Sequence, residues 1–421
     1  MAQYSDLPFR PADILLPRNC NLGLWSVVAC DQYTSEPSYW KRVEDRVGEA
    51  PSALRLILPE SRLNGGQVER DIAAVHASMD RYLDEGLFAR YPSSLIYVER
   101  TLRSGKVRRG LVGALDLEAY DYRAGTHPLI RSTEGTVLSR IPPRVAVRRN
   151  ASLEIPHVIV LTDDPGNTVI EPLSDECSEM EELYRFTLME GAGSICGWLL
   201  TEQQKERVEK AFCKLGDPSR DLDGDSMLLA VGDGNHSLAA AKACWEEIKA
   251  TLAPEKWEGC PARYALVEIE NLRDPVLEFE PIHRVVFGIC PEKMLDALNH
   301  YCPCGNAQTG AEHRFECVWG EKHSVVTVKN PTSKLPVGTL QSFLDSFLAE
   351  QPNARIDYVH GEDVARRLAR QPNAAAFLLP ALGKEELFPS VLRDGALPRK
   401  TFSMGEAHDK RFYLEARSLR R

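Results

Sequence analysis

Residues 231–237 read VGDGNHS and lie between a short apolar run and an amphipathic segment. The apolar run, residues 227–231, has the length and composition of a buried strand, and a glycine ends it. The following segment has apolar residues at helical spacing, on the face opposite its lysines and glutamates. These are Leu238, Ala241, Trp245 and Ile248. The sequence therefore predicts a strand, a tight polar loop and a helix whose first turn lies within or just after residues 235–237.

A helix that starts in this loop can bind an anion. The first backbone N–H groups of a helix lack partners within the helix, and the helix dipole is positive at that end. Gly232 and Gly234 let a ligand approach the backbone closely, because they lack side chains. The alternative is that Asp233, Asn235 or Ser237 only caps the helix, since all three residue types are favoured caps. A cap needs one side chain, whereas this loop combines a carboxylate, an amide, an imidazole and a hydroxyl, and that mixture favours a functional site.

The composition is that of a soluble, globular protein. The chain has 421 residues, 43% hydrophobic and 27% charged, and a net charge of -10. The length predicts two or three domains, and the acidic balance argues against a general nucleic-acid binder. The first residues lack a basic start and an apolar core, and no segment reaches transmembrane length, so we expect a cytoplasmic protein. Most of the 11 cysteines are expected to be reduced, and Cys302-Pro-Cys304 lacks the partners of a zinc site.

Elsewhere strand-like and helical segments alternate. Residues 55–58 have the pattern of a strand, and residues 179–189 have that of a helix. Asp31 follows the strand-like run 27–30 and could serve as a ligand or a base, although a solvated aspartate at a strand end is the commoner case.

A second informative stretch begins at Arg131, ends at Arg149 and reads RSTEGTVLSRIPPRVAVRR. It contains five arginines and a single acid, Glu134, in a protein that is acidic overall. Such a local excess suggests an anionic ligand, because the guanidinium fork suits phosphate or carboxylate. We therefore take Arg140 and Arg144 as candidate phosphate-binding residues. The alternative is a solvated, partly salt-bridged surface.

The third stretch is strand-like, covers residues 279–287 and reads FEPIHRVVF. It places His283 and Arg284 inside an apolar run. A lone histidine in such a run is usually a satisfied core residue, but the arginine keeps its charge and needs an anion or water. Both residues are therefore candidates for ligand binding.

Together the three stretches supply the parts for phosphoryl transfer. Arginines and helix amides would neutralise phosphate, one carboxylate would hold Mg²⁺, and a second would accept the proton of the attacking hydroxyl. One assignment places Asp233 on the metal and Glu134 as the base, and these roles can be exchanged. His236 is the third catalytic candidate. The chain contains no Walker loop and no protein-kinase motif set, so a kinase of this sequence belongs to another class.

Two other functions are open. Residues 232–236 contain the GD and GNH pieces typical of metallophosphoesterases, but the chain has no Asp-x-His to supply further metal ligands. The third possibility is a protein that binds a nucleotide or a phosphorylated metabolite without catalysis. Turnover in the presence of Mg²⁺ would distinguish it from the two enzymes.

Six stretches resemble the bacterial and archaeal family catalogued as domain of unknown function 1015. They are CDQYTSEPSYW, STEGTVLSRIPPRV, IPHVIVLTDDPGNTVIEPL, VGDGNHSLAAAKACWE, FEPIHRVVF and LPRKTFSMGEA. The resemblance covers nearly the whole chain. It implies membership of a family but no activity.

A more distant resemblance implies a ligand. The Asp-Gly-x-His loop is similar to the nucleotide-binding loop of the ParB, sulfiredoxin and free serine kinase superfamily, and Asp233, Gly234 and His236 match it. The resemblance implies ATP or ADP, with its phosphates on the helix start at Ser237.

The chain departs from this superfamily in two ways. The serine kinase loop continues His-His-Arg, whereas residues 235–237 are Asn-His-Ser, so Arg140, Arg144 or Arg284 would have to supply the arginine. Sulfiredoxin needs a cysteine that this loop lacks, and the acidic composition counts against DNA binding like that of ParB.

We therefore expect an α+β protein with mixed sheets and a ParB/sulfiredoxin-like strand-loop-helix core. Residues 1–290 would form the main unit with the site, and residues 291–421 a smaller α/β unit. The expected function is a phosphotransferase that uses Mg²⁺ and a nucleotide and acts on a small hydroxylated metabolite. No membrane partner is expected.

Overall fold

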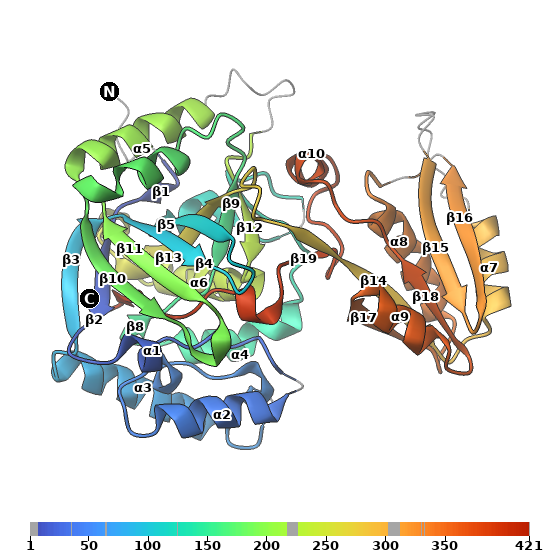
Figure 1. The fold of residues 1–421 in the computed structure, drawn as a ribbon, viewed down its shortest axis with the longest axis horizontal. Helices are drawn as coiled ribbons and strands as arrows, with labels where there is room; N and C mark the ends of the chain where they lie inside the picture. The colour runs from blue at the N-terminus through green and yellow to red at the C-terminus, as the bar shows by residue number, and fades with distance from the viewer. Residues whose placement is uncertain are drawn as a thin grey trace. The chain divides into compact units, whose positions relative to one another are not determined.

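The chain forms two compact units in this computed structural model (Figure 1). The structure describes residues 7–34, 36–63, 65–123, 125–216, 226–301, 312–329, 331 and 333–420, so Cys302 and Cys304 lie outside the described residues. Unit 1 consists of Met1–Ser132, Thr136–Leu277 and Glu406–Arg421, and unit 2 consists of Thr133–Gly135 and Glu278–Gly405. Unit 2 thus begins before residue 291, the expected start of the C-terminal unit, and the last residues return to unit 1.

The described part of unit 1 is built on a ten-stranded mixed sheet. Its strands are, in spatial order, β10 (Glu181–Thr187), β11 (Ser194–Leu199), β4 (Ile96–Thr101), β5 (Val107–Asp116), β13 (Tyr264–Asn271), β9 (Ile159–Thr162), β12 (Leu229–Asp233), β7 (Ile130–Ser132) and β6 (Tyr120–Asp121), with β1 (Phe9–Arg10) paired to β5. β12 runs parallel to β7 and antiparallel to β9. The expected α+β class with mixed sheets is therefore confirmed.

Helices cover both faces of this sheet. They are α1 (Leu22–Trp25), α2 (Pro37–Val47), α3 (Val68–Asp84), α4 (Ile141–Arg148), α5 (Glu202–Leu215) and α6 (Asn235–Lys249). In Figure 1, α5 lies on the side of the sheet opposite to α2 and α3. The predicted strand, loop and helix around residue 233 are confirmed as β12, Gly234 and α6. Two adjacent prolines start α4, because their fixed φ angles suit the first turn of a helix.

Two local predictions are wrong. Residues 179–189, predicted as a helix, contain β10, which pairs with β11 at the edge of the sheet. Residues 55–58, predicted as a strand, begin with the last residue of the short 3₁₀-helix η2 (Ala53–Arg55) and join no sheet. In both segments, packing against distant parts of the chain decides the backbone conformation rather than local spacing.

The alternation of side chains along the strands divides the core of unit 1 in two. In β4, Ile96 and Val98 belong to one hydrophobic cluster and Tyr97 to the other. In β13, Leu266 and Val267 divide in the same way. Successive side chains of a strand point to opposite faces, so each cluster occupies one face of the sheet. The first cluster contains α2 and α3 residues, and the second contains α5 and α6 residues.

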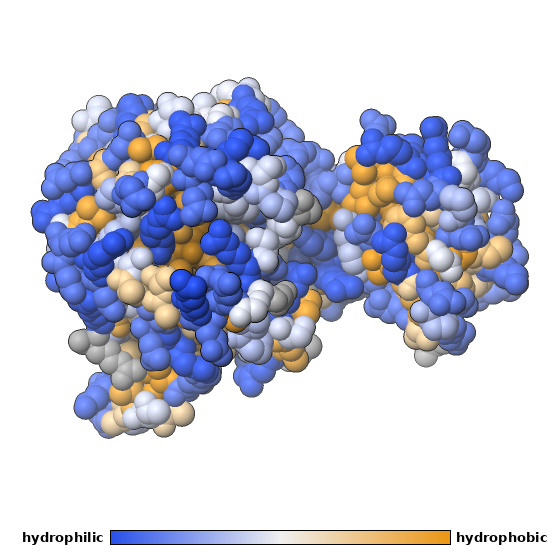
Figure 2. Space-filling model, turned by 90° about the horizontal axis from the view of Figure 1, so that it is seen from below, coloured by the Kyte–Doolittle hydropathy of each residue, from blue (hydrophilic) through white to orange (hydrophobic). Residues whose placement is uncertain are grey.

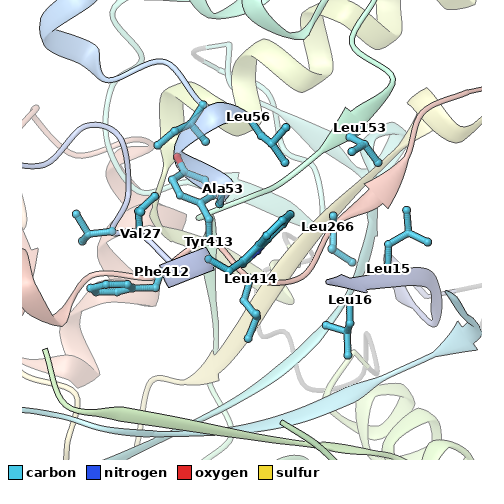
Figure 3. Packing of buried hydrophobic residues seen from close by; sticks show 14 of the residues in the cluster. Leu15, Leu16, Val27, Ala53, Leu56, Leu153, Leu266, Phe412, Tyr413 and Leu414 are labelled. Atoms are coloured by element: carbon cyan, nitrogen blue, oxygen red, sulfur yellow. The ribbon is translucent and has the colours of Figure 1, made fainter. Parts of the chain in front are cut away.

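The C-terminal segment, residues 406–420, contributes to the first cluster. Figure 3 shows Phe412, Tyr413 and Leu414 among core residues from the N-terminal half of the chain. Its backbone bonds to that half: the N–H of Tyr413 donates to the Val27 carbonyl, at 2.8 Å. Its last strand, β20 (Arg417–Ser418), pairs with β8 (Leu153–Glu154). Unit 1 is therefore complete only when this segment has joined it.

Ionic pairs are buried between this segment and β13. Arg411 Nε donates to Glu268 at 2.7 Å, and a second nitrogen of Arg411 donates to Glu415, also at 2.7 Å. Beside them, Arg108 lies 2.9 Å from Glu270. All five side chains are at most 6% exposed. Because water screens the pairs of Arg411 little, removal of one partner would leave a charge buried without compensation.

Unit 2 has an antiparallel sheet and its own core. In the described part its strands are β16 (Lys322–Lys329), β15 (Glu312–Trp319), β18 (Ala374–Leu378), β14 (Phe279–Phe287) and β17 (Arg355–His360), with β19 (Phe402–Met404) paired to β14. Its helices are α7 (Pro291–His300), α8 (Pro336–Ala349), α9 (Glu362–Ala369) and α10 (Lys384–Asp394). A hydrophobic cluster joins α9 to β14 and β18.

The surface is mostly polar. Figure 2 shows a mainly hydrophilic face with smaller hydrophobic areas. Among the described residues, the large hydrophobic side chains that are exposed are Leu138 and Val325. No helix in the described ranges combines the length and the apolar character needed to cross a bilayer.

We expect the Glu270→Gln substitution to remove a pH dependence of folding. Burial raises the pKa of Glu270 to about 8, from an ordinary value of 4.5; Arg108 opposes this shift, and Glu268 and Asp274 add to it. Between these two values the folded state binds more protons than the unfolded state. The free energy of unfolding of the wild type therefore falls as pH rises through this range, by up to about 1.4 kcal/mol per pH unit. Urea unfolding at a series of pH values measures the fall.

The control for this experiment is Glu255→Gln, at an exposed position. This variant should keep the pH profile of the wild type. A Glu270→Gln variant that also keeps the wild-type profile would contradict the prediction.

Candidate functional site

The loop between β12 and α6 turns at Gly234. This residue has φ = 80°, in the left-handed region that favours glycine. A Cβ at this position would lie 3.0 Å from Val158 Cγ2 and 3.1 Å from Val158 Cα. The turn therefore requires glycine at this one position for two reasons: the positive φ angle and the close approach to the chain before β9.

Among the residues that the structure describes, no side chain caps α6. Its N-cap is Gly234, whose carbonyl accepts from the N–H groups of Ser237 and Leu238 at 2.9 and 3.0 Å. Asp233 Oδ1 accepts from the N–H of Gly234 at 3.1 Å, before the helix begins. The alternative that Asp233, Asn235 or Ser237 serves only as a cap is therefore wrong.

Asn235 is the first residue of α6 and is buried. Its side-chain oxygen accepts no hydrogen bond from any residue that the structure describes. A buried polar atom without a partner costs free energy, unless water or a ligand supplies the missing donor. The start of α6 therefore offers a group that a bound ligand can satisfy.

Asp233 faces a buried lysine. Lys410 Nζ lies 3.5 Å from Asp233 Oδ2, and the two side chains are 9% and 16% exposed. Asp233 Oδ2 accepts no hydrogen bond within the described ranges, so this oxygen can still bind a cation or a donor. Lys410 comes from the C-terminal segment and brings a positive charge to the uncapped helix start.

Asp31 is a second carboxylate near this lysine. Burial acts to raise the pKa of Asp31, but His157, the hydrogen bond from Gln32 and the charge of Lys410 outweigh it, so the pKa lies below its ordinary value. Asp31 is therefore ionised at neutral pH. Lys410 thus interacts with carboxylates from two distant parts of the chain.

His157 joins Asp31 to the start of α6. Its Nε2 lies 4.0 Å from Asp31 Oδ1 and 3.4 Å from Ser237 Oγ. Its Nδ1 lies 2.7 Å from the hydroxyl of Tyr413. The imidazole is thereby fixed in orientation by groups from three other segments of the chain.

His236, the predicted catalytic histidine, accepts a hydrogen bond. The backbone N–H of Val137 donates to His236 Nε2 at 3.2 Å. This nitrogen is therefore unprotonated, and the histidine connects α6 to the chain before the 3₁₀-helix η5 (Leu138–Arg140). A catalytic role of His236 stays a prediction.

Acidic residues from other parts of the chain pair with the arginine-rich stretch. Arg144 lies 2.9 Å from Glu60, and Arg140 lies 3.8 Å from the same residue. Two more pairs are Arg148 with Glu154 and Arg149 with Glu247. The local excess of positive charge thus has carboxylate partners, two of which (Glu60 and Glu247) are distant in sequence, as the salt-bridged alternative expects. Binding of phosphate by Arg140 or Arg144 stays a prediction.

The remaining candidates belong to unit 2. The guanidinium of Arg284 is buried and donates to the carbonyl oxygens of residues 282, 399 and 400 and to Gln341 Oε1. Burial lowers the pKa of Arg284 to about 10. His283 Nδ1 accepts from the N–H of Leu379 at 3.2 Å. Both side chains therefore have partners within unit 2, and their ligand roles stay predictions.

Glu134 also belongs to unit 2, whereas Asp233 and His236 belong to unit 1. Glu134 forms a parallel β-bridge with Leu397. The pairing of Glu134 with Asp233 in catalysis therefore stays a prediction as well.

The sequence indicated only part of this site. Lys410 and Tyr413 have no local motif and lie after the whole of unit 2. His157 lies inside a strand-like run that does not distinguish it from a core residue. Of these four residues outside the loop, Asp31 alone could be recognised as a candidate, because it is polar and directly follows an apolar run.

The described residues contain no group of three or more His, Cys, Asp or Glu side chains that could hold a metal ion. A cation at Asp233 would therefore need further ligands of another kind, such as backbone oxygens, water or a substrate.

The chain shows a distant similarity to several solved structures. A free serine kinase variant in complex with ADP matches with 11% identity and a TM-score of 0.39, over 72% of this chain and 90% of that chain. Free serine kinase in complex with AMP matches with 12% identity and a TM-score of 0.38, over the same shares. SbnI with a C-terminal truncation, from Staphylococcus aureus, matches with 8% identity and a TM-score of 0.34, over 70% and 82%.

No curated protein matches the chain. One family does, and the match covers residues 8–347, which include β12, α6, Asp31 and His157. It ends before the segment that carries Lys410. The family expected from the sequence is thereby confirmed, and the chain belongs to the family described as "Protein of unknown function (DUF1015)".

Proposed function

We propose that this chain is a phosphotransferase that uses Mg²⁺ and a nucleotide, ATP or ADP, to phosphorylate a small hydroxylated metabolite. The observation that carries the proposal is the buried Lys410 near Asp233 and Asp31, at the uncapped start of α6. Phosphoryl transfer depends on positioning and on the neutralisation of charge. A lysine and a helix start supply the positive potential, and the two carboxylates supply a metal ligand and a proton acceptor.

The donor phosphates would lie on residues 234–237. The uncapped start of α6 attracts anions, and Lys410 adds a full positive charge with little screening by water. Asn235 and Ser237 provide polar side chains beside the backbone. The likeness of the Asp-Gly-x-His loop to the ParB, sulfiredoxin and free serine kinase superfamily also supports this placement.

Asp233 would hold the metal ion. Mg²⁺ usually binds one or two carboxylates and completes its shell with phosphate oxygens and water, so a single carboxylate suits it. Asp233 Oδ2 fits this role, because it accepts no hydrogen bond from the described residues. When bound, Mg²⁺ would neutralise charge on the phosphate oxygens.

Asp31 would be the base. The acceptor hydroxyl oxygen forms a bond to the terminal phosphorus, and the bond from that phosphorus to the leaving nucleotide oxygen breaks. The hydroxyl proton passes to the carboxylate, and the nucleotide leaves with one phosphate fewer. Because its pKa is lowered, Asp31 is ionised and able to accept this proton. Glu134 is the second candidate, and His157 would position Asp31.

The other predicted residues would assist. His236 would hold the loop through Val137, as its hydrogen bond indicates. Arg140 or Arg144 would contact phosphate by exchanging Glu60 for the ligand. A metal-dependent phosphoesterase is less well supported, since two-metal sites need more ligands than the described residues bring together.

We expect Lys410→Met to abolish nucleotide binding. The melting temperature of the wild type should rise with ADP or ATP, because a ligand at a hundredfold excess over its Kd stabilises the folded state by about 2.7 kcal/mol. Lys410→Met should show no rise relative to its own unliganded form. Asp233→Asn should respond to the nucleotide but lose the additional rise that Mg²⁺ gives. Differential scanning fluorimetry measures all three.

The control is Lys249→Met, at the opposite end of α6 from the candidate site, where Lys249 pairs with Glu118 at 2.6 Å. It should respond to nucleotide like the wild type. An unchanged response of Lys410→Met would contradict the phosphate site.

Comparison of Asp31→Asn with Glu134→Gln should identify the base. Loss of a general base lowers turnover by about 10²- to 10⁴-fold, whereas nucleotide binding should persist. We expect this result for Asp31→Asn, with Glu134→Gln close to the wild type. Phosphorus NMR of the protein with Mg²⁺, nucleotide and a panel of alcohols measures turnover.

Three outcomes of this comparison are informative. Loss of turnover in Glu134→Gln alone would transfer the role of base to Glu134. Full activity in both variants would exclude both carboxylates. Nucleotide binding without turnover in the wild type would favour the non-enzymatic alternative.

A further inference from the structure

A cavity of about 150 Å³ lies inside unit 1, next to the start of α6. Its polar lining includes Ser237, His157 and Tyr413, three residues of the candidate site. The cavity continues along α6, where Leu238 and Ala241 line it. It is therefore an inward extension of the site.

Most of the cavity wall is hydrocarbon. Leu56, Leu153 and Leu266 line it, and Figure 3 shows these residues near Tyr413. Leu56, Leu153 and Leu266 are each at most 2% exposed. This leucine-lined part of the wall offers no donors or acceptors to a polar ligand, and it favours an apolar group that leaves water.

The charged residues at the cavity are already paired. Arg144 pairs with Glu60, and Arg148 pairs with Glu154. In the protein without nucleotide, these pairs compensate the charges of the cavity wall. The polar groups that could bind the hydroxyl of a ligand are the hydroxyl of Ser237 and the imidazole of His157, which lie 3.4 Å apart.

We propose that this cavity binds the apolar body of the acceptor, so that the substrate is a small alcohol with a hydrocarbon part of about six to eight heavy atoms, not a sugar or a polyol. The inference rests on the proposed phosphotransferase function. The size follows from the volume, because a cavity of about 150 Å³ with an aliphatic lining holds a benzene-sized molecule. The hydroxyl of such a ligand lies at the end of the cavity formed by Ser237 and His157, beside the phosphate site.

The test uses benzyl alcohol and glycerol as probes of the full-length protein, without nucleotide. Each buried methylene contributes about 0.8 kcal/mol, so the aromatic ring should make benzyl alcohol bind at least about tenfold more tightly than glycerol. Calorimetric titration, or NMR where the affinity is low, measures both dissociation constants.

Filling the cavity should weaken binding. Ala151 and Ala240 both line it, and Ala151→Leu and Ala240→Val are made separately in case one does not fold. Each substitution should raise the dissociation constant of benzyl alcohol by about tenfold or more, since the added carbons occupy the space of the ring. The matched control is Ala211→Leu: Ala211 is 8% exposed, close to the 9% of Ala151, but does not line the cavity. The control should bind benzyl alcohol like the wild type.

Nucleotide binding, measured on the same samples, separates this inference from the proposed function. ADP stabilisation together with benzyl alcohol binding that the filling variants lose supports the inference. ADP stabilisation without benzyl alcohol binding, or binding that the filling variants retain, overturns the inference and leaves the phosphotransferase intact. Benzyl alcohol binding in a protein that no nucleotide stabilises overturns the acceptor role together with the proposed function.

Discussion

The candidate site depends on one buried arginine. Arg411 bonds to Glu268 in the central strand β13, to Glu415 in its own segment and to the carbonyl of Pro156. These bonds attach the C-terminal segment to the sheet in the interior, where an unpaired charge is costly. The neighbours of Arg411 in sequence are thereby fixed. Lys410 reaches Asp233, and Tyr413 lies two residues further and reaches His157.

The charges of unit 1 divide into two kinds. The arginines between residues 140 and 149 pair with carboxylates, so their charges are compensated within the fold. The polar groups around Gly234 are less fully satisfied. The side-chain oxygen of Asn235 and one oxygen of Asp233 accept no hydrogen bond among the described residues, and no side chain caps the helix. Such groups in one place indicate a binding site more specifically than a count of charges does.

Sequence patterns correctly predicted those elements whose conformation depends on neighbouring residues. Spacing and turn chemistry identified β12, Gly234 and α6, since an apolar run, a glycine and an amphipathic segment each leave a mark in sequence. The same method failed for residues 179–189, where pairing with β11 makes a strand. Within the site, only the loop has a motif. The contact between Asp233 and Lys410 joins residues separated by the whole of unit 2, and Glu60 and Glu247 are also distant from the arginines they pair with, so no short window of sequence could show these contacts.

Unit 2 is inserted between β13 and the segment that carries Lys410, and this connectivity imposes an order of assembly. During synthesis, the strands up to β13 are made before Arg411. Glu268, which is buried in the folded protein, therefore has no partner at that stage. These strands must wait while more than a hundred further residues are made, and contacts of such long range form slowly. The lysine of the site arrives last. An incompletely synthesised chain would therefore lack the lysine beside Asp233, and the candidate site would be complete only in molecules whose fold is already closed.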